Sequence, residues 1–197
     1  MRKIGVFLII VFLIGVLLPV VPAEADDRED NNAKLSGKST VVPLAKAHAH
    51  NDYEHNRPLL DALDHGFTSV EADVWLENGK LLVAHDQINV KPERTLESLY
   101  LKPLSERIKK NKGLVYKGYD QDFLLWIDIK SEDEATYLAI HEELKKYKKM
   151  LTKFTAKGVK PNNVTVIISG NRPREIMENQ HVRFASYDGR MSDLASD

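Results

Sequence analysis

The stretch 69-SVEADVWLENGKLLVAHD-86 determines how we expect this chain to fold. Its first part is typical of a strand, and because strand side chains alternate between faces, Glu71 and Asp73 point the same way. Two carboxylates on one face of an otherwise apolar strand repel each other and are costly to remove from water. A bound cation is the simplest means of keeping both ionised, so this strand predicts a metal site.

The second part of the stretch predicts a hairpin. Asn78-Gly79 between two apolar runs is the strongest short-range hairpin signal. Because so short a connection cannot make a parallel crossover, we expect Leu81–His85 to return antiparallel, as a flap. A strict two-residue turn would point His85 away from the carboxylate face. The flap must therefore twist, bulge or unpair before His85 if that imidazole is to reach the carboxylates.

Strands and helices alternate along the rest of the chain, which predicts a parallel α/β fold. The expected strands are Val41–Ala49, Thr68–Leu76, Phe123–Ile129, Asn163–Ser169 and Arg183–Tyr187. The expected helices are Arg57–His65, Thr95–Lys110 with a break at Pro103, Asp133–Leu151 and Pro173–Asn179. An eight-stranded barrel takes about 250 residues, so the sequence predicts either an open sheet or a barrel without its last strands.

The N-terminal residues carry the features of a secretory signal. Arg2-Lys3 precedes the uncharged apolar run Ile4–Val21, and the small-residue pattern that ends in Ala25 follows. We expect cleavage after Ala25, a signal peptide over residues 1–25 and a secreted protein. The alternative is an uncleaved membrane anchor, because the run approaches the roughly 20 residues that span a bilayer. Residues 26–40 are polar and predict a flexible leader, and residues 41–197 form the folded domain.

Composition limits the chemistry that this domain can perform. The 197 residues contain no cysteine, which excludes disulfides, zinc–thiolate sites and a thiol nucleophile. The net charge is −1, and it becomes −2 when Arg2, Lys3 and Glu24 leave with the signal peptide. This near-neutral charge gives no indication of the basic surface that nucleic-acid-binding proteins carry. The run Lys145–Lys160 could contact anionic lipid at a membrane surface, although such runs are more often a solvated helix face.

Polar residues gather where the predicted strands end, which is where parallel α/β sheets carry their functional groups. Asp128 lies between Ile127 and Ile129 and adds a third carboxylate. Three carboxylates favour a hard divalent cation, such as Mg²⁺ or Ca²⁺, over Zn²⁺. A buried ion pair between Asp128 and Lys130 is the alternative.

Histidines near such a site are available for proton transfer. His50 follows the first strand and His85 ends the flap, and imidazole titrates near neutral pH. A cation that neutralises charge, together with two proton carriers, suits the cleavage of an anionic substrate. A phosphate diester fits, because its leaving oxygen needs a proton.

Four motifs together resemble the glycerophosphodiester phosphodiesterase superfamily, which includes phosphatidylinositol-specific phospholipase C-like and sphingomyelinase D-like enzymes. The motifs are His50-Asn51-Asp52, Glu71-x-Asp73, His85-Asp86 and Asp128-x-Lys130. The resemblance implies a (β/α)8 TIM-barrel fold, here truncated, with one Mg²⁺ or Ca²⁺ ion and a phosphodiester or phospholipid-derived substrate.

The resemblance also implies a role for each matching residue. Glu71, Asp73 and Asp128 would hold the metal, His50 and His85 would be the catalytic acid and base, and Lys130 and Asn51 would contact substrate. His-Asn-Asp here departs from the family's usual His-Arg-Gly, and Asp128 replaces a common glutamate. Two alternatives remain open: a truncated, catalytically inactive barrel fragment, or a metal-stabilised surface-binding module.

Overall fold

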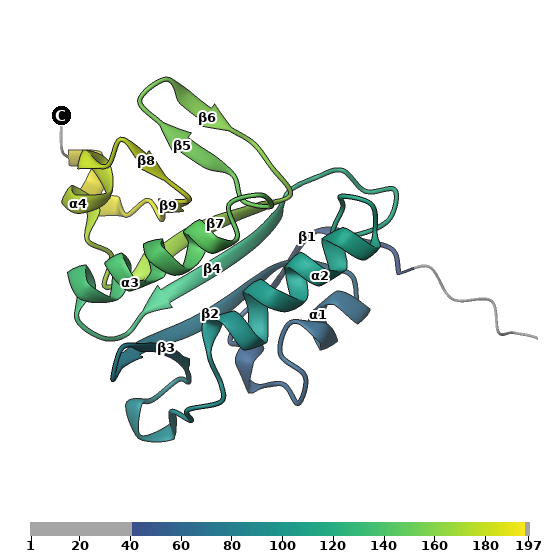
Figure 1. The fold of residues 1–197 in the computed structure, drawn as a ribbon, viewed down its shortest axis with the longest axis horizontal. Coiled ribbons are helices and arrows are strands. Elements are labelled where there is room, and N and C mark those ends of the chain that lie inside the picture. The colour runs from purple at the N-terminus through teal and green to yellow at the C-terminus, as the bar shows by residue number, and fades with distance from the viewer. Residues whose placement is uncertain (1–40, 196–197) are drawn as a thin grey trace, which may run out of the picture. The chain divides into compact units, whose positions relative to one another are not determined.

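A computed structural model describes residues 41–195, and the signal peptide and leader expected over residues 1–40 lie outside the described residues. Parallel strands form its central sheet in the order in which they occur along the chain (Figure 1). They are β1 (Leu44–Ala49), β2 (Phe67–Glu77), β4 (Phe123–Ile129), β7 (Val164–Gly170) and β9 (Ala185–Tyr187). The predicted parallel α/β arrangement is therefore confirmed.

The predicted hairpin is confirmed as well. β3 (Lys80–Val83) runs antiparallel to β2, and Glu77 pairs with Lys80 across the turn. Asn78 and Gly79 both have positive φ angles, of 49° and 75°, as a two-residue type I′ turn requires. This turn fixes the register with which the flap returns along β2.

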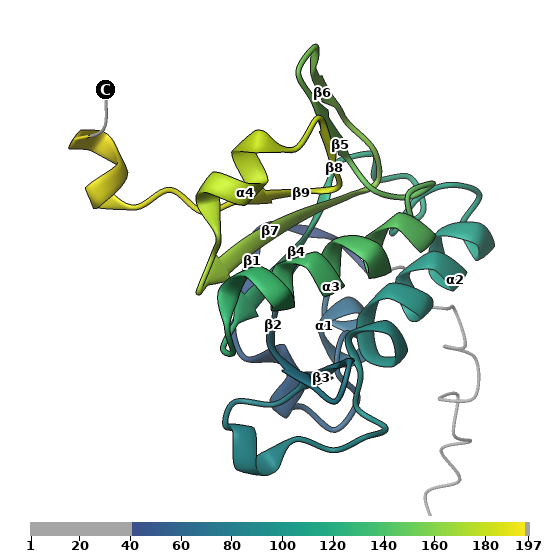
Figure 2. The same ribbon diagram turned by 60° about the vertical axis from the view of Figure 1, so that its left-hand side comes forward.

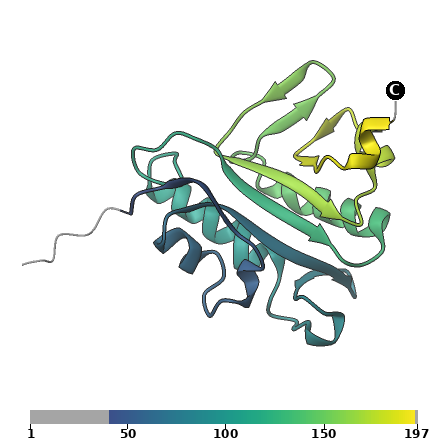
Figure 3. The same cartoon turned by 180° about the vertical axis from the view of Figure 1, so that it is seen from behind.

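The helices cover one face of the sheet. They are α1 (Leu60–Asp64), α2 (Lys102–Lys110), α3 (Asp133–Lys146) and α4 (Arg174–Asn179). Figure 2 shows α1, α2 and α3 side by side, and Figure 3 shows the opposite sheet face with no described helix across it. Under the helices lie the fully buried strand residues Val70, Ala72, Val74, Leu125, Ile127, Val166 and Ile168. These alternate with the polar and half-buried residues of the open face.

Three predicted helices differ in their bounds by more than one residue. α1 begins at Leu60, three residues later than expected. The expected helix Thr95–Lys110 consists of one π-helical turn, Glu97–Leu101, that leads directly into α2, and the predicted break at Pro103 does not occur. Pro103 is tolerated because it lies in the first turn of α2, where a missing N–H costs little. α3 ends at Lys146, five residues earlier than expected, because Met150 and Leu151 leave the helix and are buried in the core.

A small antiparallel sheet was not predicted. It consists of β5 (Lys153–Thr155), β6 (Gly158–Lys160) and β8 (Val182–Arg183), and β8 takes up the start of the expected strand Arg183–Tyr187. The lysine run Lys145–Lys160 is therefore divided between the end of α3 and a hairpin that precedes β7. Within residues 41–195, no helix combines the length and the apolar character needed to cross a membrane.

Candidate metal and catalytic site

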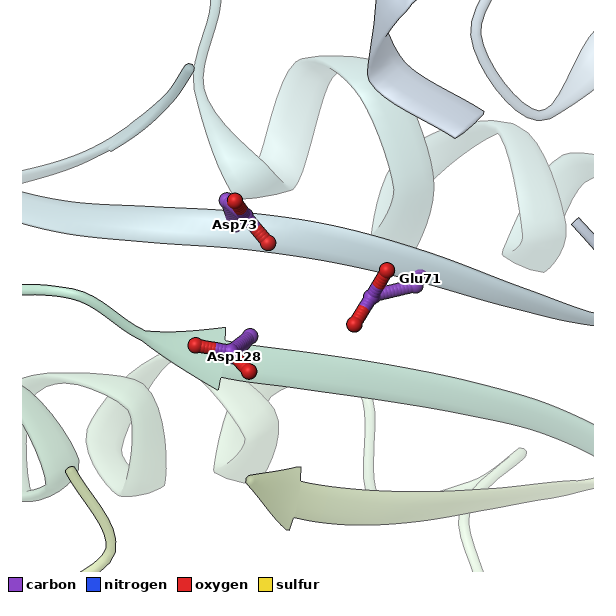
Figure 4. A group of neighbouring side chains, drawn as sticks. All are labelled: Glu71, Asp73 and Asp128. Atoms are coloured by element: carbon purple, nitrogen blue, oxygen red, sulfur yellow. The ribbon is translucent and has the colours of Figure 1, made fainter. Parts of the chain in front are cut away.

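The three predicted carboxylates meet on the open face of the sheet. β2 and β4 pair in parallel, with Asp73 directly opposite Asp128, and Glu71 lies two residues earlier on β2. One oxygen from each of the three lies within 4.8 Å of the others. Figure 4 shows the side chains directed toward one another across the gap between the two strands. The alternation of β2 explains this: the same period that buries Val70, Ala72 and Val74 under the helices places the carboxylates together.

Lys130 partly neutralises this cluster. Its ammonium nitrogen lies 3.0 Å from Asp128 Oδ1 and 3.2 Å from Asp73 Oδ2. Burial opposes the charge on Lys130, but hydrogen bonds and attraction from Asp128 and Asp73 outweigh it and raise the pKa of the ammonium. The ion pair considered as an alternative is therefore present. It leaves two negative charges on the ionised triad, which is the charge that a divalent cation balances.

One oxygen of the triad supports a cation directly. Asp73 is 1% exposed, and its Oδ1 is buried without a hydrogen-bond partner, whereas its Oδ2 is well supplied with donors. An unpaired buried carboxylate oxygen costs free energy unless something positive contacts it. With oxygens of Glu71 and Asp128 nearby, the donor set fits a hard divalent cation such as Mg²⁺ or Ca²⁺.

His50 reaches the triad from the end of β1. Its Nε2 lies 3.3 Å from Glu71 Oε2, and its side chain is 71% exposed. The same carboxylate oxygen accepts a hydrogen bond from the backbone N–H of Asn51 at 3.1 Å. Asn51 has a left-handed backbone with φ 52°, which turns the chain sharply after β1. The predicted His50-Asn51 cluster therefore contacts Glu71 with both a side chain and a backbone group.

His85 reaches the triad because the flap stops pairing with β2 before this residue. The antiparallel ladder runs from Glu77–Lys80 to Val74–Val83, and one more backbone bond, from the Ala84 N–H to the Asp73 carbonyl at 3.3 Å, is the last before His85. Beyond it, Trp75 Nε1 donates to the carbonyl of Ala84 at 3.0 Å, and His85 Nδ1 lies 3.2 Å from Asp73 Oδ2. Of the three ways predicted for His85 to turn inward, the structure uses unpairing.

Tyr53 is a site residue that the sequence interpretation missed. It lies in the short 3₁₀ helix Asp52–Glu54 and is 3% exposed. Its hydroxyl donates to Asp73 Oδ2 at 2.8 Å. Burial and this bond raise the pKa of Tyr53, so the hydroxyl keeps its proton. Its position directly after the His50-Asn51-Asp52 motif was the only signal in the sequence.

Asp52 anchors the loop that carries these residues. It is fully buried, and its Oδ2 accepts from the Leu59 backbone N–H at 2.5 Å and the Tyr100 hydroxyl at 2.9 Å. Burial raises the pKa of Asp52 above its ordinary value, although both hydrogen bonds act in the opposite direction. The Asp52 part of the His50-Asn51-Asp52 motif is therefore structural.

Beside the triad, the open face of the sheet forms a hollow of about 1000 Å³. Glu71 and Asp128 line one end of it, with His48, Leu124 and Trp126 along the sheet. His48 Nδ1 hydrogen-bonds Ser69 Oγ at 2.8 Å, and burial lowers the pKa of its imidazole. The hollow gives a ligand direct access to the carboxylates.

The sequence that forms this fold belongs to a class of phosphodiesterase-like domains. The family model described as AIM6-like phosphodiesterase domain matches residues 36–188, and the chain belongs to that family. No solved structure matches the chain.

Among curated proteins, the chain is similar to those named altered inheritance of mitochondria protein 6. It is 35% identical to the Eremothecium gossypii protein over 78% of this chain and 44% of the relative. It is 33% identical to the Arthroderma benhamiae homolog over 78% of this chain and 55% of the relative. It is 32% identical to a Saccharomyces cerevisiae protein over 73% of this chain and 41% of the relative. The chain thus spans about half the length of these relatives.

Proposed function

We propose that this domain is a divalent-metal-dependent phosphoric diester hydrolase that uses two histidines for proton transfer. The proposal rests on two features that occur together at the triad. Asp73 Oδ1 is buried and has no hydrogen-bond partner, and two imidazoles contact two different carboxylates of the triad. His50 contacts Glu71 and His85 contacts Asp73, and both imidazoles are more than half exposed. Membership of a phosphodiesterase-like family supports the same reaction class.

Each residue has a task in that reaction. Glu71, Asp73 and Asp128 would hold the cation, which when bound neutralises the phosphate charge and polarises the phosphorus–oxygen bonds. One imidazole accepts the proton of the attacking hydroxyl or water as its oxygen bonds to phosphorus. The other donates a proton to the oxygen that leaves as the ester bond breaks. Lys130 holds two of the carboxylates in place through its ion pairs, and Lys130 and Asn51 would contact the substrate.

We further propose the glycerophosphodiester phosphodiesterase type of reaction, with glycerophosphodiesters or lysophospholipids as substrates. Each of the four motifs that resemble this superfamily contributes at least one residue to the described site, and the hollow on the open sheet face has room for a substrate of that size. A peripheral contact with a membrane remains a proposal that rests on the lysines of Lys145–Lys160 alone.

We propose that the fold is the first part of a (β/α)8 barrel. Its parallel strands follow one another in chain order, whereas a doubly wound sheet reverses its order at a switch point. α1, α2 and α3 share one face, as the outer layer of a barrel does (Figure 2). Secretion is proposed from the sequence of residues 1–25, and fractionation of expressing cells, with N-terminal sequencing of the product, tests it.

Hydrolysis of glycerophosphocholine and of a lysophospholipid tests the reaction. Each is assayed with chelator, and with Mg²⁺ or Ca²⁺ restored, for wild type, His50→Ala and the control His65→Ala. His65 is an exposed helix-end histidine whose Nδ1 lies 2.8 Å from the Asp61 carbonyl. We expect chelator to abolish turnover and His50→Ala to reduce it by roughly 10²–10⁴-fold, with the control unaffected.

The other outcomes separate the alternatives. Activity that survives the chelator, or full activity in His50→Ala, would contradict the mechanism. Metal binding by calorimetry without turnover of any diester would favour the surface-binding module. The absence of both would favour an inactive fragment.

A further inference from the structure

The Tyr53 hydroxyl lies where three residues of the site meet. It is 2.8 Å from Asp73 Oδ2, 3.0 Å from His85 Nδ1 and 3.0 Å from Asn51 Oδ1. These partners come from β2, from the end of the flap and from the turn after β1. No other side chain among residues 41–195 has hydrogen-bond contacts to both Asp73 and His85.

The single proton of this hydroxyl decides how the network is ordered. Its nearest partner is the Asp73 carboxylate, and a hydrogen bond to a charged acceptor is about twice as strong as a neutral one. With the proton directed at Asp73, the hydroxyl oxygen presents lone pairs to His85 Nδ1. That nitrogen also lies 3.2 Å from Asp73 Oδ2, so both of its neighbours are acceptors. In the neutral imidazole the proton therefore resides on Nδ1, and Nε2 keeps its lone pair.

We propose that Tyr53 is a positioning residue that fixes the tautomer and the orientation of His85. By donating to Asp73 Oδ2 it holds this carboxylate so that Oδ1 is free, and by accepting from Nδ1 it directs Nε2 outward. The catalytic part of this role rests on the proposed function, because only then does Nε2 exchange a proton with substrate. The structural part stands on the contacts alone.

The variant Tyr53→Phe removes the hydroxyl and keeps the buried ring. Tyr137→Phe is the matched control, because Tyr137 is also fully buried and its hydroxyl likewise makes a side-chain hydrogen bond, to Gln180 at 2.6 Å. The first readout is the nitrogen-15 spectrum of the histidine rings in metal-free protein. It is recorded at about pH 8.5, roughly two units above the ordinary histidine pKa of about 6.5. His85→Ala identifies the His85 signal.

We expect wild type and Tyr137→Phe to show His85 as the Nδ1–H tautomer, and Tyr53→Phe to show a mixture with the Nε2–H tautomer. We also expect Tyr53→Phe to reduce kcat about 10- to 100-fold with little change in KM, as loss of an outer partner does in metal sites. A wild-type Nε2–H tautomer, or an unchanged tautomer in Tyr53→Phe, overturns the proposal. A changed tautomer with unchanged kcat overturns its catalytic part. If wild type has no activity, the proposed function fails, and the spectra still decide the role of Tyr53.

Discussion

Replacing Gly170 by alanine should disable the metal site through one misplaced carbon atom. Gly170 ends β7 opposite Ile129 and has a φ of +66°. A Cβ at this position would overlap Asp128 Oδ1 and lie 2.5 Å from the Ile129 carbonyl oxygen. The Asp128 carboxylate must then leave its present position beside Glu71 and Asp73, which changes the geometry of the triad. Gly118 supplies the control, because its φ is +76° and its Cβ would meet nothing within 4 Å.

The two variants should differ by a predictable amount. Left-handed backbone costs an alanine about 1–2 kcal/mol, which both variants share. The overlap at Gly170 adds about 1–3 kcal/mol, as overpacking does in cores. For a domain of this size, 1 kcal/mol corresponds to about 2–4 °C in Tm. In chelator, Gly118→Ala should therefore lose about 2–8 °C and Gly170→Ala about 4–20 °C.

The decisive measurement is the response to metal. At a metal concentration of about 100 times Kd, binding stabilises the folded state by about 2.7 kcal/mol, or about 5–11 °C. Thermal scans with Mg²⁺ or Ca²⁺ and with chelator should show this rise in wild type and in Gly118→Ala, and not in Gly170→Ala. A full rise in Gly170→Ala would refute the assignment of Asp128 as a ligand.

Three further predictions follow from the described contacts. Asp73→Asn should remove the metal-dependent rise in Tm in the same scans, and a retained rise would contradict its role as a ligand. Because burial raises the pKa of Asp52, its stabilising contribution is complete below about pH 3.8 and is lost as the pH rises through the raised value. The stability of wild type relative to Asp52→Asn should therefore fall as the pH rises above about 3.8 in urea denaturation, and a constant difference would disprove the reasoning. Leu125→Ala, under the helices, should lower the free energy of unfolding by about 2–5 kcal/mol, and Leu124→Ala, on the open face, should lower it distinctly less. Equal losses of unfolding free energy in denaturant titrations would argue against the assignment of the two leucines to opposite faces.

The central strands, the hairpin and the carboxylate triad could be predicted, because they depend on short stretches of sequence and on general rules of strand geometry. The strand Phe123–Ile129 has the predicted bounds, because a continuous apolar run between polar residues leaves little choice. Asn78-Gly79 predicted the hairpin because few other dipeptides accept two positive φ angles. The three carboxylates could be placed together because strand period and parallel pairing are general rules.

The missed features depend on contacts between distant segments. β5 and β6 are each three residues long, too short for a periodic pattern, and β5 also pairs with β8. Tyr53 contacts residues 20 and 32 positions away, so its place in the site follows only from the folded chain. The inward turn of His85 depends on where backbone pairing with β2 stops, directly after Ala84, and hydrophobic periodicity does not determine that point.

The order of the strands has a consequence for synthesis of the chain. The site residues all precede residue 131: His50, Tyr53, Glu71, Asp73, His85, Asp128 and Lys130. β7, whose Ser169 hydroxyl donates to Asp128 Oδ2 at 3.1 Å, and β9 follow them along the chain. At about 5–20 residues per second, a ribosome adds Tyr187 roughly 3–11 s after Lys130. The nascent chain therefore holds the proposed ligands and proton carriers while its sheet is still growing. A cation present during translation would meet the three carboxylates before β7 and β9 had been added.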